Sequence, residues 1–73
     1  MITFARVEER DERGATFRDL MPGLTYTDIG DGERCVSSIE IVDAEDCLIV
    51  HWADPADGIR IYPLGRVLWW EAV

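Results

Sequence analysis

The sequence predicts an all-β fold, either a small antiparallel, strongly bent sheet or an SH3-like barrel of five to six short strands. Short segments rich in β-branched and aromatic residues succeed one another along the chain, and turn residues separate them at frequent intervals. The segment from Arg34 to Tyr62 contains two hairpins whose register follows from the hydrophobic pattern. At 73 residues, the chain is expected to form a single small domain over residues 1–73.

The first hairpin is the better defined of the two. A four-residue turn, Asp43 to Asp46, places Val42 opposite Cys47. Counting outward gives one hydrophobic face, which pairs Ile41 with Leu48, Ile39 with Val50 and Ser37 with Trp52. The other face is mixed, as expected for a half-buried antiparallel pair, and it pairs Glu40 with Ile49, Ser38 with His51 and Val36 with Ala53.

The second hairpin is expected to turn through Asp54 to Asp57. This loop pairs Trp52 with Ile59 and Val50 with Ile61, so both isoleucines face the core. A five-residue loop would bring Arg60 to that face instead, and burial therefore favours the four-residue loop. Arg60 and Tyr62 are then expected on the outer face.

The remaining elements follow from composition and from residues that break regular structure. The charged segment Glu9 to Gly14 is expected to be a turn or loop. A short helix over Ala5 to Arg13 is the alternative, because Glu9 and Arg13 lie at positions i and i+4. Strands are expected over Ile2 to Glu8, Thr16 to Leu20, Leu24 to Ile29 and Arg66 to Glu71, the last of which pairs with the first.

The charge of the chain limits its partners. Fifteen acidic residues stand against seven arginines, with no lysine, and the formal net charge is −8. Such acidity argues against direct binding to nucleic acid or to an anionic membrane, because phosphate contacts need cations. Three interpretations stay open: solubility, adaptation to salt or a GC-rich genome, and an acidic surface for a basic protein, including mimicry of nucleic acid. Most of the acids cluster in loops, so no phosphate-like row is evident.

The two cysteines are expected to be free thiols. Cys35 and Cys47 lie on different faces and near opposite ends of the first hairpin, whereas a disulfide needs converging side chains. Free thiols suit a reducing compartment. No basic segment precedes an apolar run at the N-terminus, and no run is long enough to span a bilayer. We therefore expect a cytoplasmic protein.

No residue pattern predicts catalysis, a cofactor or a metal. His51 is the only histidine, and its pairing with Ser38 lacks an oriented acid and an oxyanion loop. A polar pair on an outer sheet face, with a pH-sensitive contact as a further possibility, is the simpler interpretation. The segment Asp28 to Glu33 lacks the ligand spacing of a calcium loop, and its two glycines form no phosphate-binding motif.

The tandem tryptophans carry the clearest sign of a binding surface. Neighbouring strand residues point to opposite faces, so one of Trp69 and Trp70 is expected inside and the other outside. An outward tryptophan would join the mixed face of the hairpins in an apolar patch rimmed by charge. The alternative is that a loop from Arg10 to Gly23 covers this patch. The predicted partner-binding residues are Ile49, His51, Arg60, Tyr62, Trp69 and Trp70, with the acidic Asp43, Glu45 and Asp46.

The closing segment, Tyr62-Pro63-Leu64-Gly65-Arg66-Val67-Leu68-Trp69-Trp70-Glu71, resembles the ends of small β-domain proteins of phages and mobile elements. In those proteins an apolar residue and a proline lead into Arg-Val and a last strand with an acidic end. The resemblance covers about the last ten residues of the chain. It implies an SH3-like barrel that acts through protein contacts, a class that includes inhibitors of host defence such as anti-CRISPR proteins.

Together these observations predict a non-catalytic, acidic protein-binding module. The hypothesis includes an anti-defence inhibitor that docks on a basic, nucleic-acid-binding host protein, with no direct contact to nucleic acid or membrane. One alternative is a homo-oligomeric structural β-domain, such as a homodimer, whose acidity serves solubility or salt adaptation. The other is a small ligand-binding or enzyme accessory subunit, which would need a concave pocket with converging polar groups.

Overall fold

The computed structural model describes residues 1–27 and 32–73 and confirms the predicted all-β class, with antiparallel pairing throughout the described strands. The strands form two sheets, with the orders β2-β1-β7 and β3-β4-β5-β6. Three short 3-10 turns, labelled η, join the later strands. The elements are β1 (Ile2–Asp11), β2 (Gly14–Leu20), β3 (Thr25–Tyr26), β4 (Arg34–Val42), η1 (Asp43–Glu45), β5 (Cys47–Trp52), η2 (Pro55–Asp57), β6 (Ile59–Pro63), η3 (Leu64–Arg66) and β7 (Val67–Ala72).

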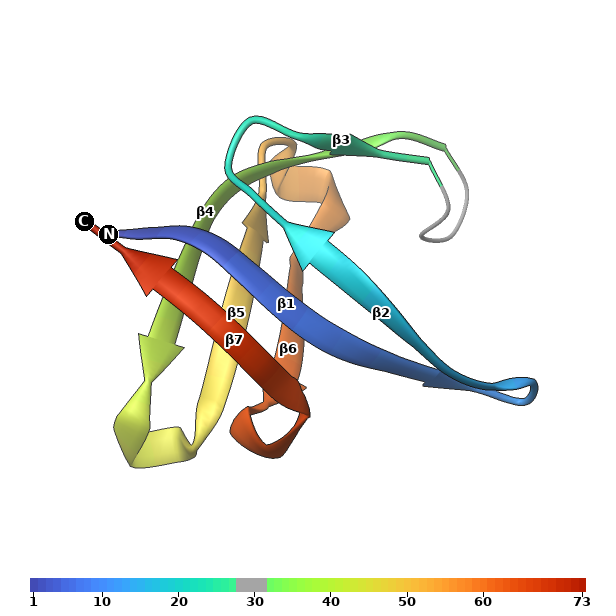
Figure 1. Ribbon diagram of the computed structural model, residues 1–73. Coiled ribbons are helices and arrows are strands. Elements are labelled where there is room, and N and C mark those ends of the chain that lie inside the picture. Colours follow the sequence, from blue (N-terminus) through green and yellow to red (C-terminus); the bar gives the residue numbers. More distant parts are fainter. Residues whose placement is uncertain (28–31) are drawn as a thin grey trace.

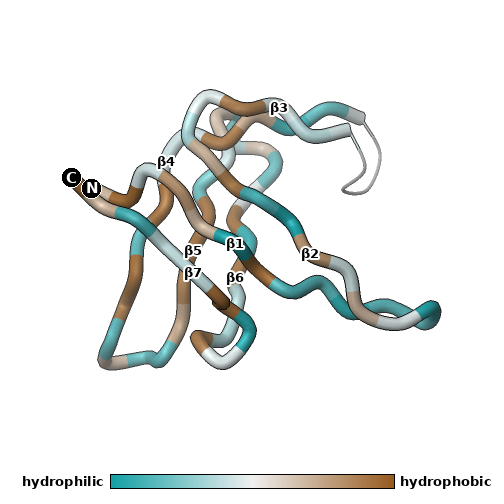
Figure 2. Tube along the Cα trace, in the orientation of Figure 1, coloured by the Kyte–Doolittle hydropathy of each residue, from teal (hydrophilic) through white to brown (hydrophobic). Residues whose placement is uncertain are grey.

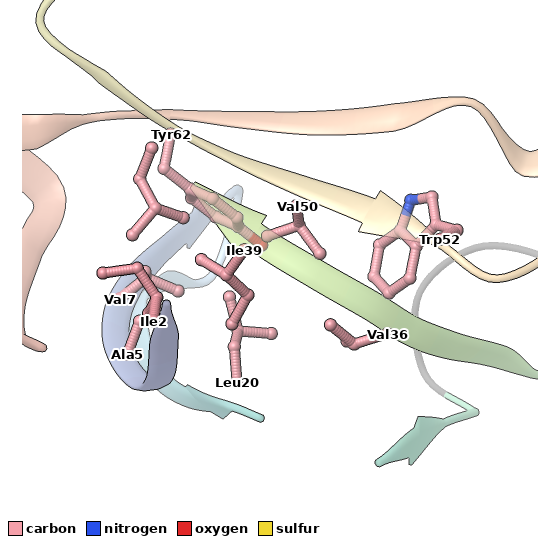
Figure 3. Packing of buried hydrophobic residues seen from close by; sticks show 10 residues of the cluster. Ile2, Ala5, Val7, Leu20, Val36, Ile39, Val50, Trp52 and Tyr62 are labelled. Atoms are coloured by element: carbon pink, nitrogen blue, oxygen red, sulfur yellow. The ribbon is translucent and has the colours of Figure 1, made fainter. Parts of the chain in front are cut away.

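The two sheets cross and enclose one hydrophobic core between them (Figure 1). Figure 3 shows side chains of the first sheet facing those of the second. Leu20 of β2, Leu48 of β5 and Val50 of β5 are fully buried, and these apolar contacts supply the main driving force for folding. The buried cluster consists of Ile2, Ala5, Val7, Leu20, Val36, Ile39, Leu48, Val50, Trp52 and Tyr62.

The N-terminal third is a long hairpin, so the alternative helix over Ala5 to Arg13 is wrong, and the predicted turn or loop over Glu9 to Gly14 shrinks to a turn at residues 12–13. β1 continues to Asp11 and pairs along its length with β2, from Ala5 opposite Leu20 to Asp11 opposite Gly14. Pairing between strands satisfies the backbone of the charged segment, which favours extension over a loop. The hydrophilic tip of this hairpin projects beyond the core (Figures 1 and 2).

The predicted register of the first hairpin is confirmed from the turn as far as Ser38 and His51. Asp46, at the end of the turn, has a left-handed backbone with φ of 54°. Beyond Ser38 a bulge intervenes, and Val36 rather than Ser37 lies opposite Trp52. A bulge inserts one residue and exchanges the faces beyond it, so Val36 is buried and the predicted pairing of Val36 with Ala53 is wrong.

The predicted register of the second hairpin is wrong by one residue. β5 pairs with β6 through His51 opposite Ile59 and Leu48 opposite Tyr62. Ile59 and Ile61 are consequently 51% and 54% exposed, whereas Tyr62 is buried. The described pairing ends at His51 and Ile59, and the connection contains η2, at whose start the Asp54 side chain accepts from the Ala56 N–H at 2.9 Å.

The last strand pairs with the first, as predicted, and the described strands number seven rather than five or six. Bulges at Thr3 of β1 and Leu68 of β7 interrupt this ladder. The strand predicted over 24–29 is observed as the short β3, and residues 28–31 lie outside the described part of the chain, so the end of the predicted strand lies there as well. In the described residues, no helix is long and apolar enough to cross a membrane.

Candidate binding surface at the β7 edge

The tandem tryptophans lie on β7, the strand at one edge of the three-stranded sheet. Trp69 is 56% exposed and Trp70 is 50% exposed, so the expectation that one of them is buried is wrong. Trp69 lies opposite Arg6 of β1, whereas Trp70 lies opposite the buried Ala5. The two rings therefore line separate hollows, as strand alternation predicts, and neither is covered because no described strand follows β7 in the sheet.

Trp69 lines a shallow groove of about 510 Å³ on the outer face of the first sheet, which we name the outer groove. Arg6 forms a two-pronged ion pair with Asp19 of β2, with N–O distances of 2.7 and 3.0 Å. Hydrogen bonding to Arg6 lowers the pKa of Asp19, so this pair stays charged at neutral pH. The groove is lined by Phe4, Arg6, Leu68, Trp69 and Glu71.

Trp70 lines a second hollow, of about 320 Å³, between the first sheet and β4; we name it the seam hollow. Its lining is mainly apolar, and the acidic side chains on it come from β4 and from η1. The lining residues are Met1, Ile2, Ile39, Ile41 and Trp70, together with Glu40 and Asp43.

The acidic turn after β4 adjoins the seam hollow. Asp43, Glu45 and Asp46 are exposed, and within residues 1–27 and 32–73 no arginine forms an ion pair with them. Like charges held close together in a turn leave a negative local potential that attracts cations. The structure thus brings one of the three predicted acidic residues, Asp43, to the hollow that the predicted Trp70 lines.

Two of the predicted binding residues, the exposed Arg60 and the buried Tyr62, belong to a polar cluster around Glu9. The Tyr62 hydroxyl donates to Glu9 Oε1 of β1 at 2.5 Å, and Arg60 Nη2 donates to Glu9 Oε2 at 2.8 Å. Arg18 Nε lies 3.6 Å from Glu9 Oε1. Burial and the hydrogen bond to Glu9 raise the pKa of Tyr62 far above its ordinary value. This cluster joins the first sheet to β6, and the predicted outward orientation of Tyr62 is wrong.

The other two predicted residues, Ile49 and His51, lie on the outer face of the second sheet. His51 Nε2 lies 2.8 Å from Glu40 Oε1, and Ser38 is its cross-strand neighbour, as predicted. Ile59 and Ile61 of β6 lie beside them. This face is apolar at its centre, and its margin meets the seam hollow at Glu40, which pairs with Ile49 and contacts His51.

The remaining chemistry-bearing groups give no reactive site. Cys35 is half-buried and Cys47 is buried, and both are free, as predicted. Burial raises the pKa of the Cys47 thiol, which makes the thiolate less available. Within the described parts of the chain, no three histidine, cysteine or acidic side chains are placed to hold a metal ion.

Sequence reasoning missed Phe4, Arg6 and Leu68, which complete the outer groove. The sequence predicted that the first and last strands pair, but two bulges decide which residues of β1 lie beside Trp69. A bulge has no sequence signal here, since neither Thr3 nor Leu68 is a glycine. Comparisons with protein-family models, curated proteins and solved structures gave no match to the chain.

Proposed function

We propose that this protein is a non-catalytic binding module that docks on a basic protein partner through the β7 edge and the acidic turn at residues 43–46. The observation that carries the proposal is the pair of half-exposed tryptophans on an edge strand, each lining its own hollow. Tryptophan is enriched among the residues that dominate protein interfaces, and monomeric proteins seldom expose such patches without a use.

The charge distribution supports a basic partner. The net charge is −8, and the acidic turn reaches the seam hollow through Asp43. Attraction between opposite charges speeds encounter and selects partners, and it weakens as salt rises. An inhibitor that occupies a basic, nucleic-acid-binding protein of a host would act in this way, in keeping with the resemblance of the closing segment.

The test compares two variants with the same change of net charge. D43N/E45Q/D46N neutralises the turn, whereas D11N/E12Q/E33Q neutralises three exposed acids elsewhere. Wild type and both variants are immobilised, exposed to nuclease-treated bacterial lysate and eluted in rising salt, and each captured protein is then purified and titrated against all three.

We expect a basic protein that binds wild type and the control variant alike, binds the turn variant at least tenfold more weakly and dissociates steeply with salt. Trp70→Ala should weaken the same complex. Equal affinity of the partner for both triple variants would overturn the proposal. So would a purified partner whose affinity is unchanged by both Trp69→Ala and Trp70→Ala.

A further inference from the structure

The free edge of β7 and the two hollows beside it suggest how a partner would be recognised. We propose that the partner contributes an extended segment, which adds to β7 as a further strand and places alternate side chains in the outer groove and in the seam hollow. Apolar side chains would enter the outer groove, and arginine or lysine would enter the seam hollow. This inference rests on the proposed function and specifies its mode of recognition.

The first step is the sheet edge. β7 pairs with β1 on one side, and among the described strands none pairs with its other side. A free edge presents unpaired N–H and C=O groups, to which an extended peptide can add. On the far side of the seam hollow, Ile39 to Val42 of β4 pair with β5 alone among the described residues. The edge thus opens onto the gap between the two sheets.

The second step is the alternation of side chains. Trp69 and Trp70 are adjacent in sequence but line different hollows on the two sides of β7. Side chains of a strand paired with β7 follow the same alternation, and directly opposite residues lie about 4.5–5.5 Å apart at Cβ. One set of an added strand's side chains therefore meets the outer groove, and the other set meets the seam hollow.

The third step is the chemistry of each hollow. The seam hollow has an apolar lining, the ring of Trp70, the carboxylate of Asp43 and that of Glu40, whose Oε1 also contacts His51 Nε2. A long basic side chain suits it, because its methylene stem packs on apolar surface while its charge meets carboxylates and an aromatic face. In the outer groove, Arg6 is already paired with Asp19, and Glu71 accepts from Trp69 Nε1 at 3.3 Å. The groove therefore offers mainly the apolar surfaces of Phe4, Leu68 and Trp69.

A second copy of the chain is the competing occupant. Antiparallel pairing of two β7 strands with Leu68 opposite Trp69 would also bring Arg66 opposite Glu71. However, each copy carries a net charge of −8, and the partner strand would bring a tryptophan, not a cation, to the acidic side of the seam hollow. The basic segment is therefore the occupant that the charges favour.

The probe is a blocked peptide as long as β7, six residues, with alternating arginine and valine. Its binding is measured by calorimetry, and protection of the β7 amides is measured by hydrogen exchange. We expect binding with protection of residues 67–72. A peptide of the same composition with the arginines in one block should bind wild type at least tenfold more weakly. The alternating peptide should bind the Trp70→Ala variant at least tenfold more weakly than it binds wild type. Phe17→Ala, which removes a ring that is 66% exposed on β2, is the matched control and should bind normally.

Two methylated peptides test the backbone contacts. Only alternate residues of an added strand donate N–H groups to β7. One peptide is N-methylated at its arginines and the other at its valines. We expect one of these two peptides to lose binding and the other to retain it. Equal binding of the block peptide, retention by both methylated peptides, or absence of β7 protection would overturn strand addition. Protection of β7 in the free protein, with a mass that rises with concentration, would show that a second copy occupies the edge. If the peptide fails but the purified partner still requires the acidic turn, strand addition fails and the proposed function stands.

Discussion

Replacing Glu9 by alanine should destabilise the fold strongly, although Glu9 lies far from the tryptophans in sequence. The Tyr62 hydroxyl is buried and donates to Glu9 at 2.5 Å, so the variant leaves a buried hydroxyl without its acceptor. Such a loss costs about 1–3 kcal/mol. The ion pair with Arg60 adds little, roughly 0–1 kcal/mol, because the Arg60 side chain is 44% exposed. The free energy of unfolding should therefore fall by about 2–3 kcal/mol in total.

For a domain of this size, about 1 kcal/mol shifts the melting temperature by roughly 4–8 °C, so a decrease of about 8–24 °C is expected. The assay is urea and thermal unfolding, followed by circular dichroism and by the fluorescence of the buried Trp52. Glu8→Ala is the matched control, because it removes the neighbouring carboxylate, whose partner Arg10 is 59% exposed. It should change stability by no more than about 1 kcal/mol.

A double-mutant cycle isolates the contact. In a Tyr62→Phe background no buried hydroxyl remains, so Glu9→Ala should be milder there by about 1–2 kcal/mol. The reasoning is refuted if Glu9→Ala is no more destabilising than Glu8→Ala, or if the Tyr62→Phe background leaves its effect unchanged.

Two further predictions concern titration and thiol access. The pKa of Tyr62 is raised in the folded state, so its contribution to stability is complete below its unfolded pKa of about 10 and is lost as pH rises above that value. The urea midpoint of wild type should therefore fall more between pH 9 and pH 11 than that of Tyr62→Phe. Equal decreases of the midpoint in the two proteins would contradict this. Because burial protects Cys47 and raises its pKa, a thiol reagent at pH 8 should label Cys35 quickly and Cys47 only after unfolding. Labelling is measured by mass spectrometry on the variants Cys35→Ser and Cys47→Ser, each of which retains one thiol. Equal labelling rates of the two variants would contradict the burial of Cys47.

Local pattern was sufficient for the first hairpin, because the turn at 43–46 fixes the register and alternation shows which face is buried. The prediction failed at Ser37, where a bulge exchanges the faces. It failed again at β6, because burial alone ranks Ile61 above Tyr62 as a core residue. The tyrosine is accommodated inside by Glu9, a contact with another strand that no local pattern reveals.

The candidate surface was also predictable only in part. Strand alternation correctly placed Trp69 and Trp70 on different sides of one strand. Their common exposure depends on the position of β7 at the edge of the sheet, which is a property of the whole topology. The predicted set also combined residues of two sheets, since Ile49 and His51 lie on the second sheet and the tryptophans lie on the first.

The pairing of β1 with β7 joins the most distant parts of the sequence: the Met1 amino group donates to the Val73 carbonyl oxygen, 72 positions away. The entropic cost of closing so long a loop exceeds that of closing a four-residue turn by roughly 2–3 kcal/mol, since each doubling of loop length adds about 0.6 kcal/mol. The β4–β5 hairpin is therefore expected to form early and β7 to join its sheet late. The edge that carries the tryptophans then exists only in the completed fold. A ligand of that edge would bind the native chain and not the unfolded one, and it would raise the stability of the domain by an amount that grows with the logarithm of its concentration relative to its Kd.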